Sequence, residues 1–79
     1  MPYIKKDNRL AIDLGDVPLD AGELNYLFTT LCHEYWERSG RNYQAFNDII
    51  GALEGCKLEL YRRKVAPYED KKIEENGDV

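Results

Sequence analysis

The sequence has little cysteine, little histidine and no long apolar run. Its 79 residues include two Cys and one His, too few for a disulfide framework or for the three or four ligands of a zinc site. No segment approaches the ~20 apolar residues of a membrane span, and the opening residues lack the apolar core of a signal peptide. We therefore expect a cytoplasmic protein with reduced thiols at Cys32 and Cys56 and without a metal.

Catalytic motifs and a broad basic surface are also missing. Cys32 and His33 are adjacent, so on a helix their side chains point about 100° apart and do not form a nucleophile and base. Gly51 and Gly55 lie in a helical pattern without the Lys-Ser/Thr of a phosphate-binding loop. The net charge of -4 argues against binding long DNA or RNA. The sequence thus predicts no enzyme activity, no cofactor, and neither a long nucleic acid nor a membrane as partner.

A first helix is predicted over residues 20–39. Asp20 can cap the free amides of its first turn, and Glu23 follows at the capping-box spacing. Ser39 and Gly40 end it. Apolar residues at three- and four-residue steps line one face, namely Leu24, Leu27, Phe28, Leu31 and Tyr35.

A second, longer helix is predicted over residues 43–66. Its apolar face consists of Phe46, Ile49, Ile50, Leu53, Leu60 and Val65. Gly51 and Gly55 weaken it, which indicates either a close helix crossing or room for a ligand. Pro67 is expected to end or kink the helix near Ala66, leaving a turn and tail over 67–79. The two-residue connection at 41–42 predicts that the second helix returns antiparallel to the first.

Residues 1–19 are mixed in pattern. Leu10, Ile12 and Leu14 alternate with other residues, which fits a short strand or one or two helical turns; we favour an arm with a short helical piece. The predicted fold class is all-α, a single small domain built as an antiparallel helical hairpin with an N-terminal arm and a short C-terminal helix. Because so short a chain has too little core by itself, we expect a homo-oligomer.

The strongest candidate site is the cluster Tyr61, Arg62 and Arg63, with Tyr68 just after the proline. Arginine forks match phosphate oxygens, and tyrosine rings could stack on a base or ribose. The chain has six Tyr, more than a small core needs, which also indicates an interface or pocket. The alternative is a solvated helix face on which Glu59 forms ordinary ion pairs with both arginines.

Two further groups of polar residues could contribute. Asn25 and Tyr26 lie on the flank of the first apolar stripe, where they could contact a ligand or form hydrogen bonds with other polar side chains of this flank at a subunit contact. Asn47 and Glu54 are seven residues apart on the second helix and therefore share a face. Glu54 could accept from ribose hydroxyls or pair with an arginine.

Several stretches resemble a family of very short phage and prophage proteins. They are MPYIKK at the start, GELNY at 22–26, LYRR at 60–63, APYEDKK at 66–72 and ENGDV at 75–79. In size and style the chain is also similar to the phage Sequestin and Lockin families, oligomeric proteins that bind nucleotide immune signals. The resemblance implies an anti-defence protein of the bacterial host cytoplasm.

What this resemblance implies is sequestration, without chemistry, of a small phosphate-bearing signal of the cyclic ADP-ribose type. Side-chain chemistry would then assign phosphate contacts to Arg62 and Arg63, and stacking to a tyrosine. Polar recognition would fall to Asn25, Asn47 and Glu54, and the stacking candidates are Tyr26, Tyr61 and Tyr68. One alternative is a helical protein–protein interaction or adaptor module of a phage, and a third is a small nucleotide hydrolase.

Overall fold

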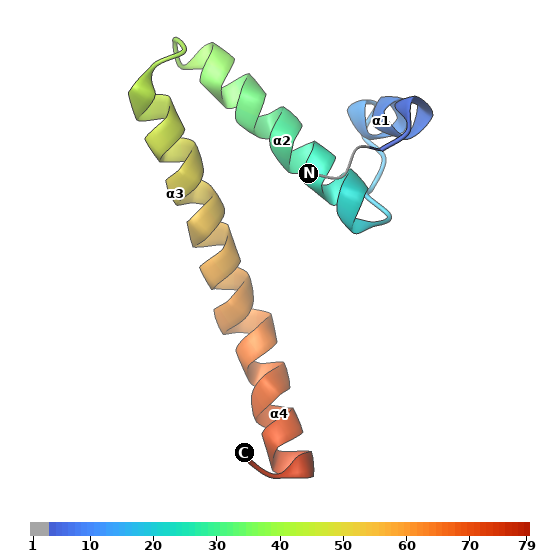
Figure 1. Ribbon diagram of the computed structural model, residues 1–79, viewed down its shortest axis with the longest axis vertical. Helices are drawn as coiled ribbons and strands as arrows, with labels where there is room; N and C mark the ends of the chain where they lie inside the picture. The colour runs from blue at the N-terminus through green and yellow to red at the C-terminus, as the bar shows by residue number, and fades with distance from the viewer. Residues whose placement is uncertain (1–3) are drawn as a thin grey trace. The chain divides into compact units, whose positions relative to one another are not determined.

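The computed structural model describes residues 4–79, which contain helices and connections but no strand (Figure 1). The elements are α1 (Lys6–Asp13), α2 (Ala21–Arg38), α3 (Tyr43–Leu60), the π-helical turn η1 (Tyr61–Val65) and α4 (Ala66–Asn76). The all-α prediction is confirmed for these residues, whereas the antiparallel hairpin and the homo-oligomer stay predictions. Residues 1–3, which begin the predicted arm, lie outside the described part. The chain divides into two compact units, one ending at Ala45 and the other beginning at Phe46.

In the first unit, α1 is the short helical piece expected within the arm. It ends at Asp13, two residues before Gly15, whose φ of 101° lies in the left-handed region that glycine adopts without strain. The Asp16 N–H then donates to the Ala11 carbonyl at 3.1 Å, closing the helix end. α1 contacts α2, and Ile12 is one of the few buried side chains, 4% exposed.

The predicted cap of α2 is confirmed. The Glu23 N–H donates to Asp20 Oδ1 at 2.8 Å, which satisfies one of the free amides of the first turn. The Glu23 carboxylate accepts in return from the Leu19 N–H at 3.4 Å, one residue earlier than in a standard capping box. Asp20 therefore fixes where α2 begins.

The connection between α2 and α3 is set by three residues after the helix end. Gly40 has a φ of 89°, and the Arg41 N–H donates to the Trp36 carbonyl at 3.0 Å, the bond of a Schellman motif. The Asn42 Oδ1 then accepts from the Ala45 N–H at 2.8 Å and caps the start of α3. The predicted end at Ser39 and Gly40 is confirmed, since Arg38 is the last residue of α2.

In the second unit, α3, η1 and α4 follow one another as a single rod (Figure 1). The helix does not end near Ala66 but continues through Pro67 to Asn76. α4 is thus the predicted short C-terminal helix, although residues 67–76 are helical where a turn and tail were also predicted. The reason lies in η1, where the Ala66 N–H donates to the Tyr61 carbonyl five residues back. A widened turn relieves the crowding that a proline ring imposes on the preceding turn.

Very little of the described chain is buried. Ile12 and Ala45 are its buried apolar residues, and Glu23 is its buried charged residue. Many large apolar residues of α2 and α3 are more than a third exposed; they include Leu24, Phe28, Leu31, Phe46, Ile50, Leu53, Leu58 and Leu60. Among residues 4–79, no helix combines the length and apolar character that a membrane crossing requires.

Candidate functional site

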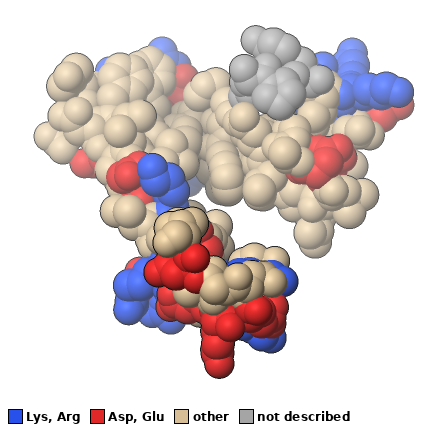
Figure 2. All heavy atoms as spheres, turned by 60° about the horizontal axis from the view of Figure 1, so that its bottom comes forward, with Lys and Arg blue, Asp and Glu red and all other residues tan. Residues whose placement is uncertain are grey.

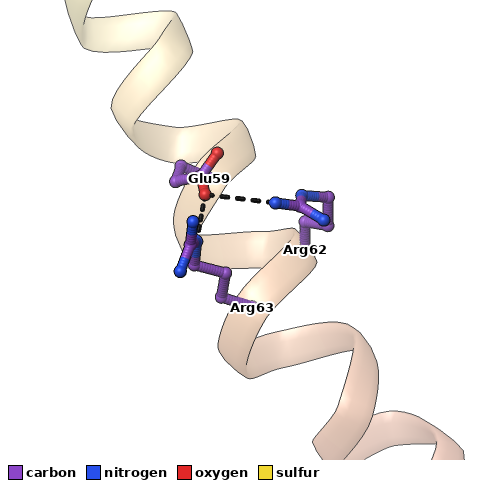
Figure 3. A network of polar contacts seen from close by, with 3 residues as sticks. All are labelled: Glu59, Arg62 and Arg63. Atoms are coloured by element: carbon purple, nitrogen blue, oxygen red, sulfur yellow. Dashed lines mark hydrogen bonds and ion pairs between the residues drawn. The ribbon is translucent and has the colours of Figure 1, made fainter.

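The two arginines of the predicted phosphate site share one carboxylate (Figure 3). Arg62 Nη2 lies 3.4 Å from Glu59 Oε1, and Arg63 Nε donates to the same oxygen. The side chains are 73% and 66% exposed. The ion pairs considered as the alternative are therefore formed, and at this exposure each contributes a few tenths of a kcal/mol. With Lys64 next to them, the local balance is three cations against one anion.

Tyr61 faces the C-terminal side of the cluster. Its hydroxyl donates to Glu69 Oε1 at 2.6 Å, across eight residues. This hydrogen bond raises the pKa of Tyr61, with further contributions from the negative charge of Glu69, from desolvation and from the charge of Asp70. The phenol is thus held in its neutral, donating form, and the residue as a whole is 51% exposed.

The other predicted residues of the second unit are engaged locally or exposed. The Lys72 Nζ lies 5.5 Å from the centre of the Tyr68 ring, a cation–π arrangement on α4. Glu54 forms an ion pair with Lys57 Nζ at 3.1 Å, so its carboxylate is paired with a lysine and not with an arginine. Asn47 lies exposed on the same helix as Glu54. A ligand at Tyr68 would compete with the lysine for the ring face.

In the first unit, Tyr26 closes one side of an open hollow between α1 and α2. Its hydroxyl donates to both carboxylate oxygens of Asp13, at 2.8 and 2.9 Å. That hydrogen bond is the main cause that raises the pKa of Tyr26, and desolvation adds to it. The hollow is lined by Lys6, Asp7, Arg9, Leu10, Asp13 and Tyr26. Its two cations and two anions balance, so it has no net attraction for a phosphate.

Asn25 supports its own helix. Its backbone carbonyl accepts from Thr29 Oγ1 at 2.8 Å, and its side-chain oxygen lies 3.3 Å from the same hydroxyl. Asn25 and Tyr26 belong to the unit that ends at Ala45, whereas the other six predicted residues belong to the unit that begins at Phe46.

The charged side chains and the two cysteines form no metal site in the part of the chain that the structure describes, and the face drawn in Figure 2 mixes charges of both signs. Figure 2 shows Lys and Arg side chains intermingled with Asp and Glu side chains on the C-terminal end of the chain, which is turned forward. Within residues 4–79, no group of three or more His, Cys, Asp and Glu is placed to hold a metal ion. Cys32 is half-buried, Cys56 is exposed, and both are free thiols.

Sequence reasoning anticipated the Glu59 pairs but missed three contacts. Glu59 precedes the arginines by three and four residues, the regular helical spacings. The partners of Tyr26, Tyr61 and Tyr68 were not predicted. For Tyr68, the lysine four residues later, Lys72, could have indicated the cation–π contact. For Tyr26 and Tyr61 the sequence contains no pattern that indicates their partners.

Comparison with known proteins gives a family whose function is unknown. A family model described as a domain of unknown function (DUF6899) matches residues 1–79. No curated protein matches the chain, and no solved structure does.

Proposed function

The chain belongs to the DUF6899 family, a domain of unknown function, and we propose that it acts as a non-enzymatic helical interaction module whose apolar faces are covered by another chain. One observation carries the proposal. Ile12 and Ala45 are the buried apolar residues of the described chain, while many large apolar residues of α2 and α3 stay exposed. Exposed apolar surface on this scale is typical of a protein–protein contact.

The energy available from covering α3 is considerable. Phe46, Leu53 and Leu60 are 48%, 40% and 58% exposed. Full burial of such a side chain contributes about 1.5–3 kcal/mol, so covering these three half-exposed residues contributes about 3 kcal/mol. An isolated helix gains little from propensity alone and depends on packing of its apolar face. The contact therefore stabilises the rod and binds the partner at the same time.

Hydrogen exchange and circular dichroism test the proposal. If another chain is needed, the amides of α3 should exchange quickly in the dilute monomer and slowly once the partner is bound. The helical signal should rise with binding as well. A monomer that unfolds cooperatively and already protects α3 from exchange would contradict the proposal.

A second candidate function, sequestration of a small nucleotide signal of the cyclic ADP-ribose type, has its own support. Arg62, Arg63 and Lys64 lie consecutively on η1 beside Tyr61, in a chain whose net charge is -4. π-helical turns are frequent at functional sites. Glu59 would have to give up its two guanidinium contacts for a phosphate to take them.

Calorimetry with ADP-ribose and cyclic ADP-ribose tests this candidate. A stoichiometric heat should disappear in Arg62→Ala and in Arg63→Ala, and Glu59→Gln should tighten binding because it frees both guanidinium groups. Arg38→Ala is the matched control, since Arg38 forms a similar exposed ion pair with Glu34 at 3.1 Å on α2. The absence of binding heat with both nucleotides would exclude this candidate function. Recovery of a chemically altered nucleotide would instead favour the alternative of a nucleotide hydrolase.

A further inference from the structure

We infer that the chain covering α3 is a second copy of this protein, paired antiparallel through one apolar stripe. The inference rests on the proposed function, because it names the partner of the same exposed surface. The stripe consists of Phe46, Ile49, Ile50, Leu53, Cys56 and Leu60, all on α3.

The spacing of the stripe is that of a helix-pairing seam. Phe46, Ile49, Leu53, Cys56 and Leu60 follow one another at steps of three, four, three and four residues, the a and d positions of a heptad pattern. Ile50 widens the stripe beyond that seam. At about 100° per residue the six side chains span about 120° of the helix, more than the narrow seam used by a single helix pair.

A stripe of this width needs two neighbouring helices, and one chain offers only one. α2 is the other long helix, with 18 residues. α1 has eight residues and already packs on α2, and α4 continues the rod of α3. Even if α2 returned against α3, as the short connection predicts, one edge of the stripe would remain open. A second copy supplies the missing helices and gives a symmetric four-helix assembly.

The apolar layers of the stripe favour pairing of the stripe with itself. In an antiparallel pair centred between Glu54 and Gly55, Leu53 lies opposite Cys56 of the partner subunit, and Leu60 lies opposite Ile49 of the partner subunit. Apolar residues thus meet at both of these layers, as helix pairing requires, and at the end of the pair Phe46 lies opposite Arg63 of the partner subunit. Lys57 lies about 20° outside the five-residue seam, between Phe46 and Ile50 around the helix. It pairs with Glu54 on its own helix and leaves the seam itself apolar.

Charge favours the antiparallel orientation. In a parallel pair, the cations Arg62, Arg63 and Lys64 of both copies would lie side by side and repel. In the antiparallel pair they lie at opposite ends, with Arg63 about 25 Å along the axis from the layer of its symmetry mate. This separation exceeds the Debye length of about 8 Å at physiological salt, so the repulsion is screened.

Sedimentation equilibrium tests the inference with a matched pair of variants. The wild-type protein should have twice the chain mass of 9.2 kDa, and dilution should lower its mass and its helical signal together. Leu53→Lys should raise the dimer dissociation constant at least 100-fold. Leu58→Lys should leave it nearly unchanged, because Leu58 is 57% exposed on the same helix and lies about 140° around it from Leu53.

The outcomes separate this inference from the proposed function. If Leu53→Lys and Leu58→Lys both stay dimeric, the stripe is not the dimer contact. The protein would then still be an interaction module, but one that uses another face. A wild-type monomer with weak helicity at every concentration would overturn the second copy and indicate a different protein as partner. A cooperative monomer that only Leu53→Lys destabilises would overturn both, because α2 would then cover the stripe within one chain. The wild-type dilution series decides the matter even if Leu53→Lys fails to fold.

Discussion

Replacing Pro67 with alanine should convert η1 into ordinary α-helix. Proline has no N–H, and its ring crowds the carbonyl four residues earlier, here that of Arg63. The chain accommodates the proline ring by a π-helical hydrogen bond from the Ala66 N–H to the Tyr61 carbonyl. Alanine removes both constraints, so the α-helical hydrogen-bonding pattern can run through the whole rod.

The size of the effect follows from helix geometry. In a regular α-helix, residues eight apart are rotated by about 80° from one another, so Tyr61 and Glu69 would not meet. The widened turn brings them into line, and their hydrogen bond of 2.6 Å depends on it. Pro67→Ala should therefore break this bond while raising the free energy of unfolding by about 1–3 kcal/mol, through helix propensity and one restored backbone bond.

The pKa of Tyr61 reports the change. It is raised in the folded protein by the bond to Glu69, so the stability that this bond contributes is complete below the ordinary tyrosine pKa of about 10. It is lost as the pH rises through the folded-state pKa. In Pro67→Ala the pKa of Tyr61 should return toward about 10. The loss of stability that the wild-type protein shows as the pH rises through the Tyr61 pKa should then disappear.

Two measurements decide the outcome. Carbon NMR of ring-labelled tyrosine gives the titration, with Tyr61→Phe to assign the signal, and urea unfolding gives the stability. Pro18→Ala, which changes a proline before α2, should leave the Tyr61 titration as it is. An unchanged Tyr61 pKa in Pro67→Ala would refute the reasoning, because the π turn would then have a cause other than the proline.

Three other substitutions test local features. Asp20→Ala should lower the free energy of unfolding by about 1 kcal/mol in urea, because it removes the cap of α2; Asp20→Asn should retain most of it, and equal losses would contradict the cap. Gly55→Ala should raise the free energy of unfolding by about 1 kcal/mol, since a Cβ there meets nothing within 4 Å; a loss would reveal a helix packed on that face. Tyr26→Phe removes the bond to Asp13 that raises the Tyr26 pKa, so thermal unfolding of the wild type should weaken more than that of the variant as the pH rises from 9 past the tyrosine pKa of about 10.

The helix ends could be predicted because their causes are local. Asp20 acts on an amide three residues away, and Gly40 permits a backbone conformation that other residues adopt at a cost. Pro67 is the exception. Its effect depends on whether the preceding turn can widen, which is a property of the assembled rod and has no fixed signature in the sequence.

The candidate site was predictable only as far as regular helix spacing reaches. The pairs of Glu59 with Arg62 and Arg63 follow from steps of three and four residues. The bond from Tyr61 to Glu69 needs the π turn, which changes the spacing of residues on one face. The bond from Tyr26 to Asp13 needs α1 to pack on α2, and neither helix alone indicates that contact.

The apolar stripe and the basic cluster occupy successive parts of one rod, which makes the two candidate functions separable. The stripe ends at Leu60, and the cations begin at Arg62. Antiparallel pairing would therefore place one basic cluster at each end of the paired region, with Arg63 opposite Phe46 of the partner subunit, so the two functions would share only this end layer. If Leu53→Lys removed both self-association and nucleotide binding, the ligand would need groups from two copies. If it removed only self-association, η1 would bind by itself, and the assembly would serve stability.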